Sequence, residues 1–343
     1  MLVNGKHYRT VWVDNGEVRM IEQNRLPFSF EVFQAKSLEE TCRAIRDMVV
    51  RGAGAIGATA GFAMAQHFLN PSGRTAEEAA DMVRGTRPTA QNLFYAVDRV
   101  CRAAENSSQP QKAALEASQA IADEDAEACR LIGMHAGSLV AGRPRVMTHC
   151  NAGWLAFVDW GSALSPVYMA VRDGAKPFVY VSETGPRGQG ARLTAWELQQ
   201  ERVEHAVIAD NASGFFLNKG EVDVIITGAD RIARNGDTAN KIGTYMKAVL
   251  AKELGIPFYI AAPTSTIDFR CGSATDIPIE FRGEEEVLWK AGVNEEGVPG
   301  KILVAAPGSH AKNPAFDVTP AKYITGIITE MGIFKPGEIA GLK

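Results

Sequence analysis

Asp230 is the residue of this chain whose position most clearly suggests chemistry. It follows a nearly uninterrupted β-branched run at 222–226 and the turn residue Gly228. Such a run is typical of a strand that is covered on both faces in a parallel sheet. The carboxyl ends of such strands face the ligand crevice, so we expect the Asp230 carboxylate to lie where a reaction takes place.

The segment after Asp230 adds further polar groups. Asn235-Gly236 predicts a turn, and Asp237 or Thr238 is expected to cap the helix that follows. Asn240 and Lys241 would then lie in the first turn of that helix and point at a bound ligand. A polar loop that only connects a strand to a capped helix is the alternative for these residues taken alone.

A second reactive group, Cys150, ends another short apolar run in the segment Thr148-His-Cys-Asn-Ala-Gly153. A cysteine between a strand and the N-terminus of a helix has its thiolate stabilised by the helix dipole, which suits a base or a nucleophile. His149 would point to the other side of a continuing strand, so the sequence does not indicate a Cys–His pair. A buried structural cysteine is the alternative, as we expect for most of the other cysteines, which lie largely in predicted helices.

Two basic segments could bind an anion. Arg51-Gly-Ala-Gly-Ala-Ile-Gly57 formally contains the dinucleotide pattern G-x-G-x-x-G, but an amphipathic helix precedes it where that fingerprint needs a strand. A glycine-rich turn that enters a helix still presents backbone N–H groups to an anion, and Arg51 adds a fork of donors. Close helix packing through small residues is the alternative. Arg87 precedes a predicted helix start at Pro88 and is either a phosphate ligand or a solvated surface arginine.

The segment 182–197 contains a loop with three glycines and a proline, whose backbone can approach a ligand closely. Gln189, Arg187 and Arg192 in this segment could bind hydroxyl or phosphate groups. Polar clusters thus follow three predicted strands, and in a parallel sheet they would meet in one crevice. This convergence indicates an enzyme.

The elements that must position these residues fall into two parts. Before about residue 142 we expect a β-hairpin at 8–22 around Asn15-Gly16, and helices near 37–49, 53–69, 89–104 and 111–139, with capping boxes at Ser37/Glu40 and Thr75/Glu78. Afterwards apolar runs alternate with helical segments, at 145–148, 178–182, 206–209, 222–227, 257–262 and 302–305. This βα alternation predicts an α/β fold, with an α-rich domain and small sheet at 1–142 and a Rossmann-like parallel-sheet domain at 143–343.

The composition excludes several classes of function. The 343-residue chain has a net charge of −4 and no long apolar run, which offers no basic field for nucleic acid or an anionic membrane and no membrane span. The N-terminus lacks the apolar core of a signal peptide. Five scattered cysteines form no metal-binding spacing and leave an odd thiol, which favours a reducing cytoplasm.

Taken together, these clusters resemble the methylthioribose-1-phosphate isomerase family, which is related to the regulatory subunits of eukaryotic initiation factor 2B. The resemblance covers nearly the whole chain and is most specific at 148–153, 189–198, 228–232 and 235–245. It implies a helical N-terminal domain, a Rossmann-like C-terminal domain, a homodimer, no cofactor, and an aldose–ketose isomerisation in methionine salvage. It also implies that Cys150 and Asp230 are catalytic and that the substrate, chiefly its phosphate, is bound by Arg51, Gly52, Ala53, Arg87, Gln189, Asn240 and Lys241.

The implied substrate is a furanose phosphorylated at C1, so the aldehyde that ordinary aldose isomerases use is masked. Our hypothesis is that Asp230, kept protonated by an apolar pocket, donates a proton to the ring oxygen during opening. Cys150 would then shuttle a proton from C2 to C1 through an enediol-like species, or would assist a direct hydride shift. The sequence leaves both routes open.

Departures from the family pattern leave the substituent at C5 open. The family usually has proline at position 54, arginine at 185 and bulky residues at 187–188, where this chain has Gly54, Gly185 and Arg187-Gly188. Trp154 replaces a typically small residue. Substrates with a 5-deoxy, 5-hydroxy or 5-phospho group are therefore alternatives to methylthioribose 1-phosphate. A non-catalytic initiation-factor-like subunit and an NAD-dependent oxidoreductase are alternatives from other classes, and the second is disfavoured by the missing strand before Gly52.

Overall fold

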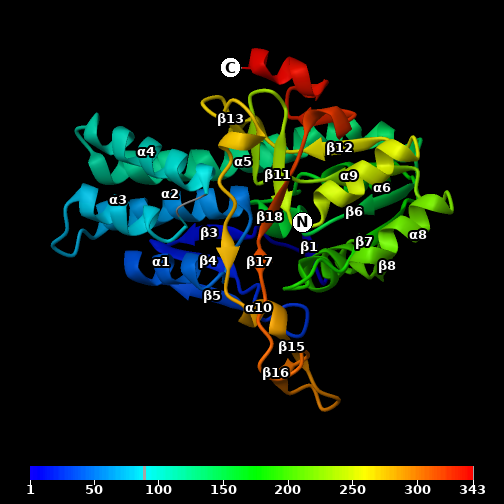
Figure 1. Ribbon diagram of the computed structural model, residues 1–343. Coiled ribbons are helices and arrows are strands. Elements are labelled where there is room, and N and C mark those ends of the chain that lie inside the picture. Colours follow the sequence, from blue (N-terminus) through cyan, green and yellow to red (C-terminus); the bar gives the residue numbers. More distant parts are fainter. Residues whose placement is uncertain (88–89, 343) are drawn as a thin grey trace.

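A computed structural model describes residues 1–87 and 90–342, and its core is a large parallel sheet (Figure 1). Within the described residues the sheet has seven strands in the order β20-β19-β12-β9-β6-β7-β8. These are β6 (Arg145–Thr148), β7 (Phe178–Ser182), β8 (Glu204–Ile208), β9 (Val224–Thr227), β12 (Phe258–Ala261), β19 (Gly326–Thr329) and β20 (Gly332–Phe334). Neighbouring strands are parallel except for β20, which pairs antiparallel with β19. The expected α/β fold is confirmed, and the first five predicted runs are strands of this sheet.

The sixth predicted run, 302–305, is wrong as a strand of the parallel sheet. It overlaps β16 (Pro299–Leu303), which pairs antiparallel with β15 (Trp289–Val293) in a hairpin that projects from the body of the molecule (Figure 1). Ile302 is apolar but 68% exposed, so the apolar run at this place does not indicate a buried strand. The buried Ile-Ile pair of β19 occupies the expected place in the sheet instead.

Helices cover both faces of the sheet, as a parallel sheet requires. Apolar residues of α5 (Pro110–Ala141), α6 (Ser165–Arg172) and α7 (Ala195–Gln200) pack on one face, in a core that includes Ile132 and Val167. On the other face, α8 (Ser213–Asn218) and α9 (Thr244–Glu253) contribute Leu217, Ala248 and Ala251. Because α5 also packs against the N-terminal helices, it joins the two parts of the chain. The division into domains 1–142 and 143–343 stays a prediction.

The N-terminal part combines a small sheet with helices. The strands β3 (Val11–Asp14), β4 (Glu17–Ile21) and β5 (Val32–Ala35) form an antiparallel sheet, and the predicted hairpin turn at Asn15-Gly16 is confirmed by positive φ angles of 51° and 80°. The helices are α1 (Leu38–Arg46), α2 (Ala53–Leu69), α3 (Ala76–Arg84) and α4 (Gln91–Glu105). A short hairpin of β1 (Leu2–Val3) and β2 (Lys6–His7) precedes them.

Helix α2 is the centre of this part, since α1, α3, α4 and α5 all pack on it and nearly all of its residues are buried. The predicted capping box at Thr75 and Glu78 is confirmed. Ser37 does accept a hydrogen bond from the Glu40 amide, but the Glu40 carboxylate accepts from the amide of Lys36 and not from that of Ser37, so the box is incomplete. The predicted helical position of Pro88 lies outside the described residues.

A second, smaller sheet corrects the prediction for the residues after Asp230. It has the order β13-β10-β11-β18, with β10 (Arg231–Ala233), β11 (Thr238–Lys241), β13 (Ile267–Asp268) and β18 (Phe316–Thr319). Asn240 and Lys241 therefore lie on a strand, and α9 begins three residues later, at Thr244. The Asn-Gly pair is a strong hairpin signal, and here it overrides the capping signal of the next two residues.

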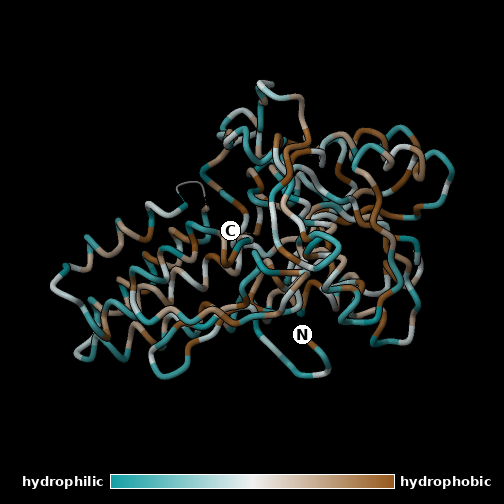
Figure 2. The backbone as a smooth tube through the Cα atoms, turned by 90° about the horizontal axis from the view of Figure 1, so that it is seen from below, coloured by the Kyte–Doolittle hydropathy of each residue, from teal (hydrophilic) through white to brown (hydrophobic). Residues whose placement is uncertain are grey.

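The remaining elements are short. They are strands β14 (Phe281–Arg282) and β17 (Asn313–Pro314), helix α10 (Glu285–Leu288), a π-helical turn at Gly190–Thr194, and 3₁₀ turns at Trp154–Ala156, Asp210–Ala212, Thr264–Thr266, Ala274–Asp276, Ala321–Tyr323 and Pro336–Leu342. Figure 2 shows that loops at the edge of the molecule are largely hydrophilic. Among the described residues, no helix is both long and apolar enough to cross a membrane.

Candidate active site

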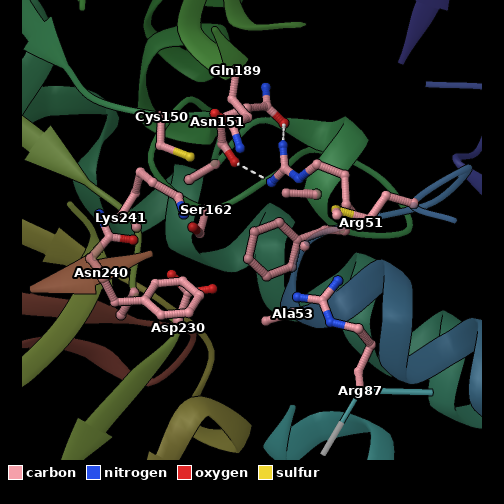
Figure 3. A pocket seen from close by; sticks show the side chains of 18 of the residues that line it. Arg51, Ala53, Arg87, Cys150, Asn151, Ser162, Gln189, Asp230, Asn240 and Lys241 are labelled. Atoms are coloured by element: carbon pink, nitrogen blue, oxygen red, sulfur yellow. Dashed lines mark hydrogen bonds between the residues drawn. The ribbon is translucent and has the colours of Figure 1, made fainter. Parts of the chain in front are cut away.

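The residues that the sequence predicts for the site line one pocket at the carboxyl ends of β6, β7 and β9 (Figure 3). The pocket is open to solvent, and the space between its walls and at its mouth amounts to about 620 Å³. In Figure 3, Cys150, Asn151 and Gln189 lie on one side and Ala53 and Arg87 on the opposite side. The predicted residues that line this pocket are Arg51, Gly52, Ala53, Arg87, Cys150, Gln189, Asp230, Asn240 and Lys241.

Cys150 is held in an unusual backbone conformation directly after β6. Its φ is +65°, its amide donates a hydrogen bond to Thr184 Oγ1 at 2.8 Å, and its carbonyl accepts one from Thr194 Oγ1 at 2.7 Å. A non-glycine residue in this region is strained and persists only where its surroundings fix it, and such residues cluster at functional sites. The expected helix N-terminus is wrong, because only a 3₁₀ turn at Trp154–Ala156 follows and α6 begins at Ser165. The thiol therefore lacks the support of a helix dipole.

His149 does not pair with Cys150, in agreement with the expected alternation along the strand. Its side chain is fully buried, and Nε2 donates a hydrogen bond to the carbonyl of Ile242 at 2.8 Å. Burial lowers the pKa of His149 well below its usual value, and the nearby ammonium of Lys247 lowers it further. A neutral, inward-facing imidazole is a structural group rather than a base for the pocket.

Asp230 follows β9, with its amide donating to the carbonyl of Ala239 at 2.9 Å. Asp230 is accessible to solvent, but its accessible surface faces the inside of the pocket, where protein surrounds it. This desolvation raises the pKa of Asp230, although Lys241 and Arg51 are the leading charges that oppose the increase. The protonated carboxyl expected from the sequence thus has a physical basis in burial, but the surroundings are cationic and not apolar.

The pocket carries an excess of positive charge. Among the described residues that line it, Arg51, Arg87, Lys241 and Arg282 face a single carboxylate, that of Asp230. Arg87 Nη1 is buried without a hydrogen-bond partner, and burial lowers the pKa of Arg87. Lys241 Nζ donates to the carbonyl of Ala315 at 2.6 Å and lies 4.4 Å from the centre of the Phe316 ring. Such a set of cations suits an anion of more than one charge, such as a phosphate.

The start of α2 contributes backbone donors to the same pocket. Gly52 has a φ of +93°, and a Cβ atom there would overlap Ala156, so only glycine fits. The turn brings Gly52 and Ala53 to the pocket wall, where the free N–H groups of a 17-residue helix are available. The anion-binding interpretation of this motif is therefore favoured over packing alone, although glycines further along α2 do pack closely.

The remaining polar groups suit hydroxyl binding. Gln189 Oε1 is buried without a partner. Asn240 Nδ2 donates to Thr244 Oγ1 at 3.0 Å, which fixes the orientation of its amide. Ser162 Oγ also lines the pocket without a partner. Unpaired polar atoms of this kind are expected where a ligand supplies the missing hydrogen bonds.

Sequence reasoning missed a buried carboxylate that organises this site. Glu197, fully buried, accepts hydrogen bonds from Asn151 Nδ2 at 2.8 Å, the amides of Trp154 and Leu155 at 2.9 and 3.1 Å, and the Tyr168 hydroxyl at 2.8 Å. Burial raises the pKa of Glu197 to about 7 despite these bonds. Arg51 in turn donates to Asn151 Oδ1 at 2.8 Å and to its carbonyl at 2.7 Å (Figure 3). Glu197 therefore fixes the turn after Cys150 and, through it, the guanidinium of Arg51.

Two departures from the family pattern lie away from the open pocket. Trp154 is fully buried in the core, with its ring centre 6.0 Å from that of Trp196, and it does not line the pocket. The replacement at Trp154 therefore does not change the lining of the pocket. Gly54 packs against α5, where a Cβ atom would overlap Asp125 and Phe157. Here a larger residue is excluded by the buried carboxylate of Asp125.

No group of three or more His, Cys, Asp and Glu side chains within residues 1–87 and 90–342 has an arrangement that could hold a metal ion. The chemistry that the described side chains themselves can supply is proton transfer by a carboxyl and a thiol beside a bound anion.

Comparisons with known proteins identify the group to which the chain belongs. The model of the initiation factor 2 subunit family matches residues 49–336. A methylthioribose-1-phosphate isomerase of Methylocella silvestris is 47% identical over 355 residues, covering 99% of this chain and 97% of the relative, and one of Methylorubrum populi is 46% identical, covering 100% and 98%. The crystal structure of 5-methylthioribose 1-phosphate isomerase from Pyrococcus horikoshii is 42% identical with a TM-score of 0.86, covering 98% of this chain and 97% of that one. The translation initiation factor eIF-2B, subunit delta, from A. fulgidus is 37% identical with a TM-score of 0.83, covering 97% of each. The chain therefore belongs to the methylthioribose-1-phosphate isomerase family, within the broader initiation factor 2 subunit family.

Proposed function

We propose that this protein isomerises 5-methylthioribose 1-phosphate to 5-methylthioribulose 1-phosphate, an aldose–ketose conversion of methionine salvage. The observation that carries the proposal is that Cys150 and Asp230 line the same pocket as the cations. Full-length relatives that are 42–47% identical bear the name of this isomerase.

The 1-phosphate binds at the start of α2, with Arg51 and Arg87 as charged ligands and the amides of Gly52 and Ala53 as backbone donors. Lys241 lies across the pocket and neutralises the remaining phosphate charge. Gln189 and Asn240 bind the ring hydroxyls, which supply the hydrogen bond that Gln189 Oε1 lacks. These proposed roles are supported by the position of each group in the pocket and by the preference of a dianion for guanidinium forks and helix N-termini.

The reaction begins with proton donation from Asp230 to the ring oxygen, which opens the furanose and leaves an electron-deficient C1. The raised pKa of Asp230 supports its role as the acid. The thiolate of Cys150 then removes the proton from C2 and returns it to C1, while the hydroxyl on C2 becomes the ketone by losing its proton to the Asp230 carboxylate. In the alternative route, hydrogen moves from C2 to C1 as hydride and Cys150 only stabilises the charge.

The test is turnover of a panel of sugar phosphates followed by NMR. Methylthioribose 1-phosphate, 5-deoxyribose 1-phosphate, ribose 1-phosphate and ribose 1,5-bisphosphate are each incubated with the wild type and with Cys150→Ser. We expect methylthioribose 1-phosphate to give its 1-phosphoketose, and the variant to lose this activity. Turnover of another member of the panel in preference to it would replace the proposed substrate.

Substrate deuterated at C2 separates the two routes. Complete washout of the label into solvent would refute the hydride shift, and full retention at C1 would count against the thiol shuttle.

A non-catalytic regulatory subunit is the second candidate, because the 37% identical structure is that of a translation initiation factor subunit. A silent subunit has no need for a thiol and a carboxyl together in a cationic pocket, so the site favours the enzyme. Absence of turnover across the whole panel, with folded protein, would favour the regulatory subunit.

We also propose a cytoplasmic homodimer, as the family resemblance implies. Light scattering at micromolar concentration tests the assembly, and a mass of one chain would refute it.

A further inference from the structure

Thr184 contacts the backbone of the reactive cysteine without reaching the pocket. It is fully buried and does not line the active-site pocket. Its Oγ1 accepts the hydrogen bond from the Cys150 amide at 2.8 Å and donates its own hydrogen to the carbonyl of Ser182 at 2.9 Å. Because that hydrogen is committed to Ser182, the lone pairs of the oxygen are left to face Cys150. The hydroxyl is therefore a fixed acceptor for the turn that carries the thiol.

The backbone of Thr184 is strained in the same way as that of Cys150. Their φ angles are +63° and +65°, and they follow β7 and β6, which pair in parallel within the central sheet. A positive φ is rare for a β-branched residue and persists only where the surroundings fix it. Two strained residues at neighbouring strand ends, joined by a hydrogen bond, thus form one structural unit behind the pocket.

Asp210 holds Thr184 in this conformation. It lies just after β8, the next strand of the sheet. Its Oδ1 accepts from the Thr184 amide at 2.9 Å, and its Oδ2 accepts from the Gly185 amide at 2.7 Å. Two successive amides bonded to one side chain fix the turn after β7. The contacts therefore run from Asp210 through Thr184 to Cys150, across the ends of three adjacent strands.

A second threonine, Thr194, holds the other side of the Cys150 residue but has a further contact. Its Oγ1 donates to the Cys150 carbonyl at 2.7 Å and accepts from Asn151 Nδ2 at 3.2 Å. Asn151 in turn orients Arg51, a proposed phosphate ligand. Thr194 is thus connected to anion binding as well as to the thiol, whereas the hydroxyl of Thr184 has its two hydrogen bonds to Cys150 and Ser182.

We infer that Thr184 is a positioning residue of the reaction, which holds the Cys150 turn so that the thiol meets C2 and C1 of the substrate. Figure 3 shows the Cys150 side chain pointing into the pocket. Thr184 acts through Cys150 and touches no substrate. This inference rests on the proposed function, since both routes proposed for the hydrogen transfer need the thiol in place.

The test compares Thr184→Val with Thr184→Ser. Valine keeps the shape of the side chain and removes the acceptor, whereas serine keeps the hydroxyl. Thr184→Val should lower kcat about 10–100-fold, because a shift of about 1 Å at a reacting group costs up to about 10²-fold. Its KM and its affinity for inorganic phosphate in calorimetry should stay close to those of the wild type, and Thr184→Ser should retain most of the activity. Substrate deuterated at C2 should give Thr184→Val a primary isotope effect on kcat, because hydrogen transfer is the step that slows.

Thr329→Val is the matched control. Thr329 is also fully buried, at the end of β19, and its Oγ1 accepts from the Met331 amide at 3.1 Å. The substitution removes the same kind of bond away from the pocket, so it should lower stability without changing kcat. Thr194→Val should lower kcat and also weaken phosphate binding. Asp210→Asn leaves one oxygen for two amides, and it should lower kcat with the same isotope effect even if Thr184→Val does not fold.

An unchanged kcat in Thr184→Val would overturn the inference, and so would a loss that Thr184→Ser or Thr329→Val shares. A lower kcat without an isotope effect would overturn it too, because another step would then be slowed. Failure of the wild type to turn over methylthioribose 1-phosphate would refute the proposed function separately. Hydrogen exchange of the peptide that contains Cys150 would still decide the structural role, since its amide should exchange faster in Thr184→Val but not in Thr184→Ser.

Discussion

Replacement of Glu197 by glutamine should damage both stability and phosphate binding, although Glu197 touches no substrate. Its two oxygens accept four hydrogen bonds, two at Oε1 from Asn151 and the Leu155 amide, and two at Oε2 from Tyr168 and the Trp154 amide. Glutamine has one oxygen and one NH₂ group in the same space. If the NH₂ group replaces Oε1, Asn151 Nδ2 and the Leu155 amide lose their acceptor. If it replaces Oε2, the Trp154 amide loses its acceptor, whereas the Tyr168 hydroxyl can turn and accept from the NH₂ group.

The magnitude follows from the more favourable orientation, in which one buried donor is left unsatisfied. Such a donor costs about 1–3 kcal/mol, so we expect a loss of about 1–3 kcal/mol in the free energy of unfolding. The measurement belongs at pH 8, above the pKa of about 7, where the Glu197 carboxylate is mainly ionised. In a chain of this size the midpoint of thermal unfolding should fall by several degrees.

Urea unfolding followed by circular dichroism measures the stability, and steady-state kinetics measure the second effect. Because Asn151 orients Arg51, the variant should show a raised KM for the sugar phosphate at a temperature where it is still folded. Glu204→Gln, on an exposed strand residue, is the matched control and should change neither quantity. If Glu197→Gln were as stable as that control, the reasoning from unsatisfied donors would be wrong.

Three further predictions test other parts of the site. Gly52→Ala should lose at least about 1–3 kcal/mol of stability and much of the phosphate affinity, because its φ is +93° and its Cβ would overlap Ala156; calorimetry with inorganic phosphate checks it. Asp230→Asn should lower kcat by about 10²–10⁴-fold with substrate still bound, and in the wild type kcat/KM should fall as rising pH deprotonates Asp230, which pH–rate profiles measure. Burial raises the pKa of Asp125 to about 7, so the protonated carboxyl stabilises the folded protein at acid pH, and this stability is lost as pH rises from about 4 through 7. Asp125→Asn should flatten the dependence of the unfolding free energy on pH, as measured by urea unfolding. Its amide oxygen can still accept the hydrogen bond from the Val158 amide.

The sequence predicts much of the fold because its buried strands are local signals. Runs such as 145–148 and 222–227 are apolar and β-branched, and both are strands of the central sheet. The run at 302–305 fails because an exposed hairpin can also be apolar, and nothing local distinguishes Ile302 from a buried isoleucine. Burial on both faces is a tertiary property, so a short run alone cannot establish it.

Some site residues are also predicted from the sequence, whereas others are revealed only by the tertiary structure. The sequence predicts that Lys241 lies in the first turn of a helix and points at the ligand. Lys241 does line the pocket, but it lies on strand β11 and not on a helix. The prediction of its position succeeds because both the predicted helix and the observed strand follow Asp230 in the chain. Arg282 reaches the pocket from β14, a two-residue strand with no sequence signal, so only the tertiary structure reveals it. Asn151 could have been found, because it directly follows Cys150 within the most specific motif.

The Arg51–Asn151 contact also links the two halves of the proposed reaction. Arg51 belongs to the segment that begins α2, while Asn151 follows β6 and shares its backbone turn with Cys150. A shift of the helical part relative to the sheet would therefore move the anion ligands and the thiol-bearing turn together, because Glu197 fixes Asn151 on the sheet side. Phosphate binding and placement of the thiol are consequently one structural event. On this basis a substitution that breaks the Arg51–Asn151 contact should lower kcat as well as phosphate affinity, because the anion ligand and the Cys150 turn lose their common support.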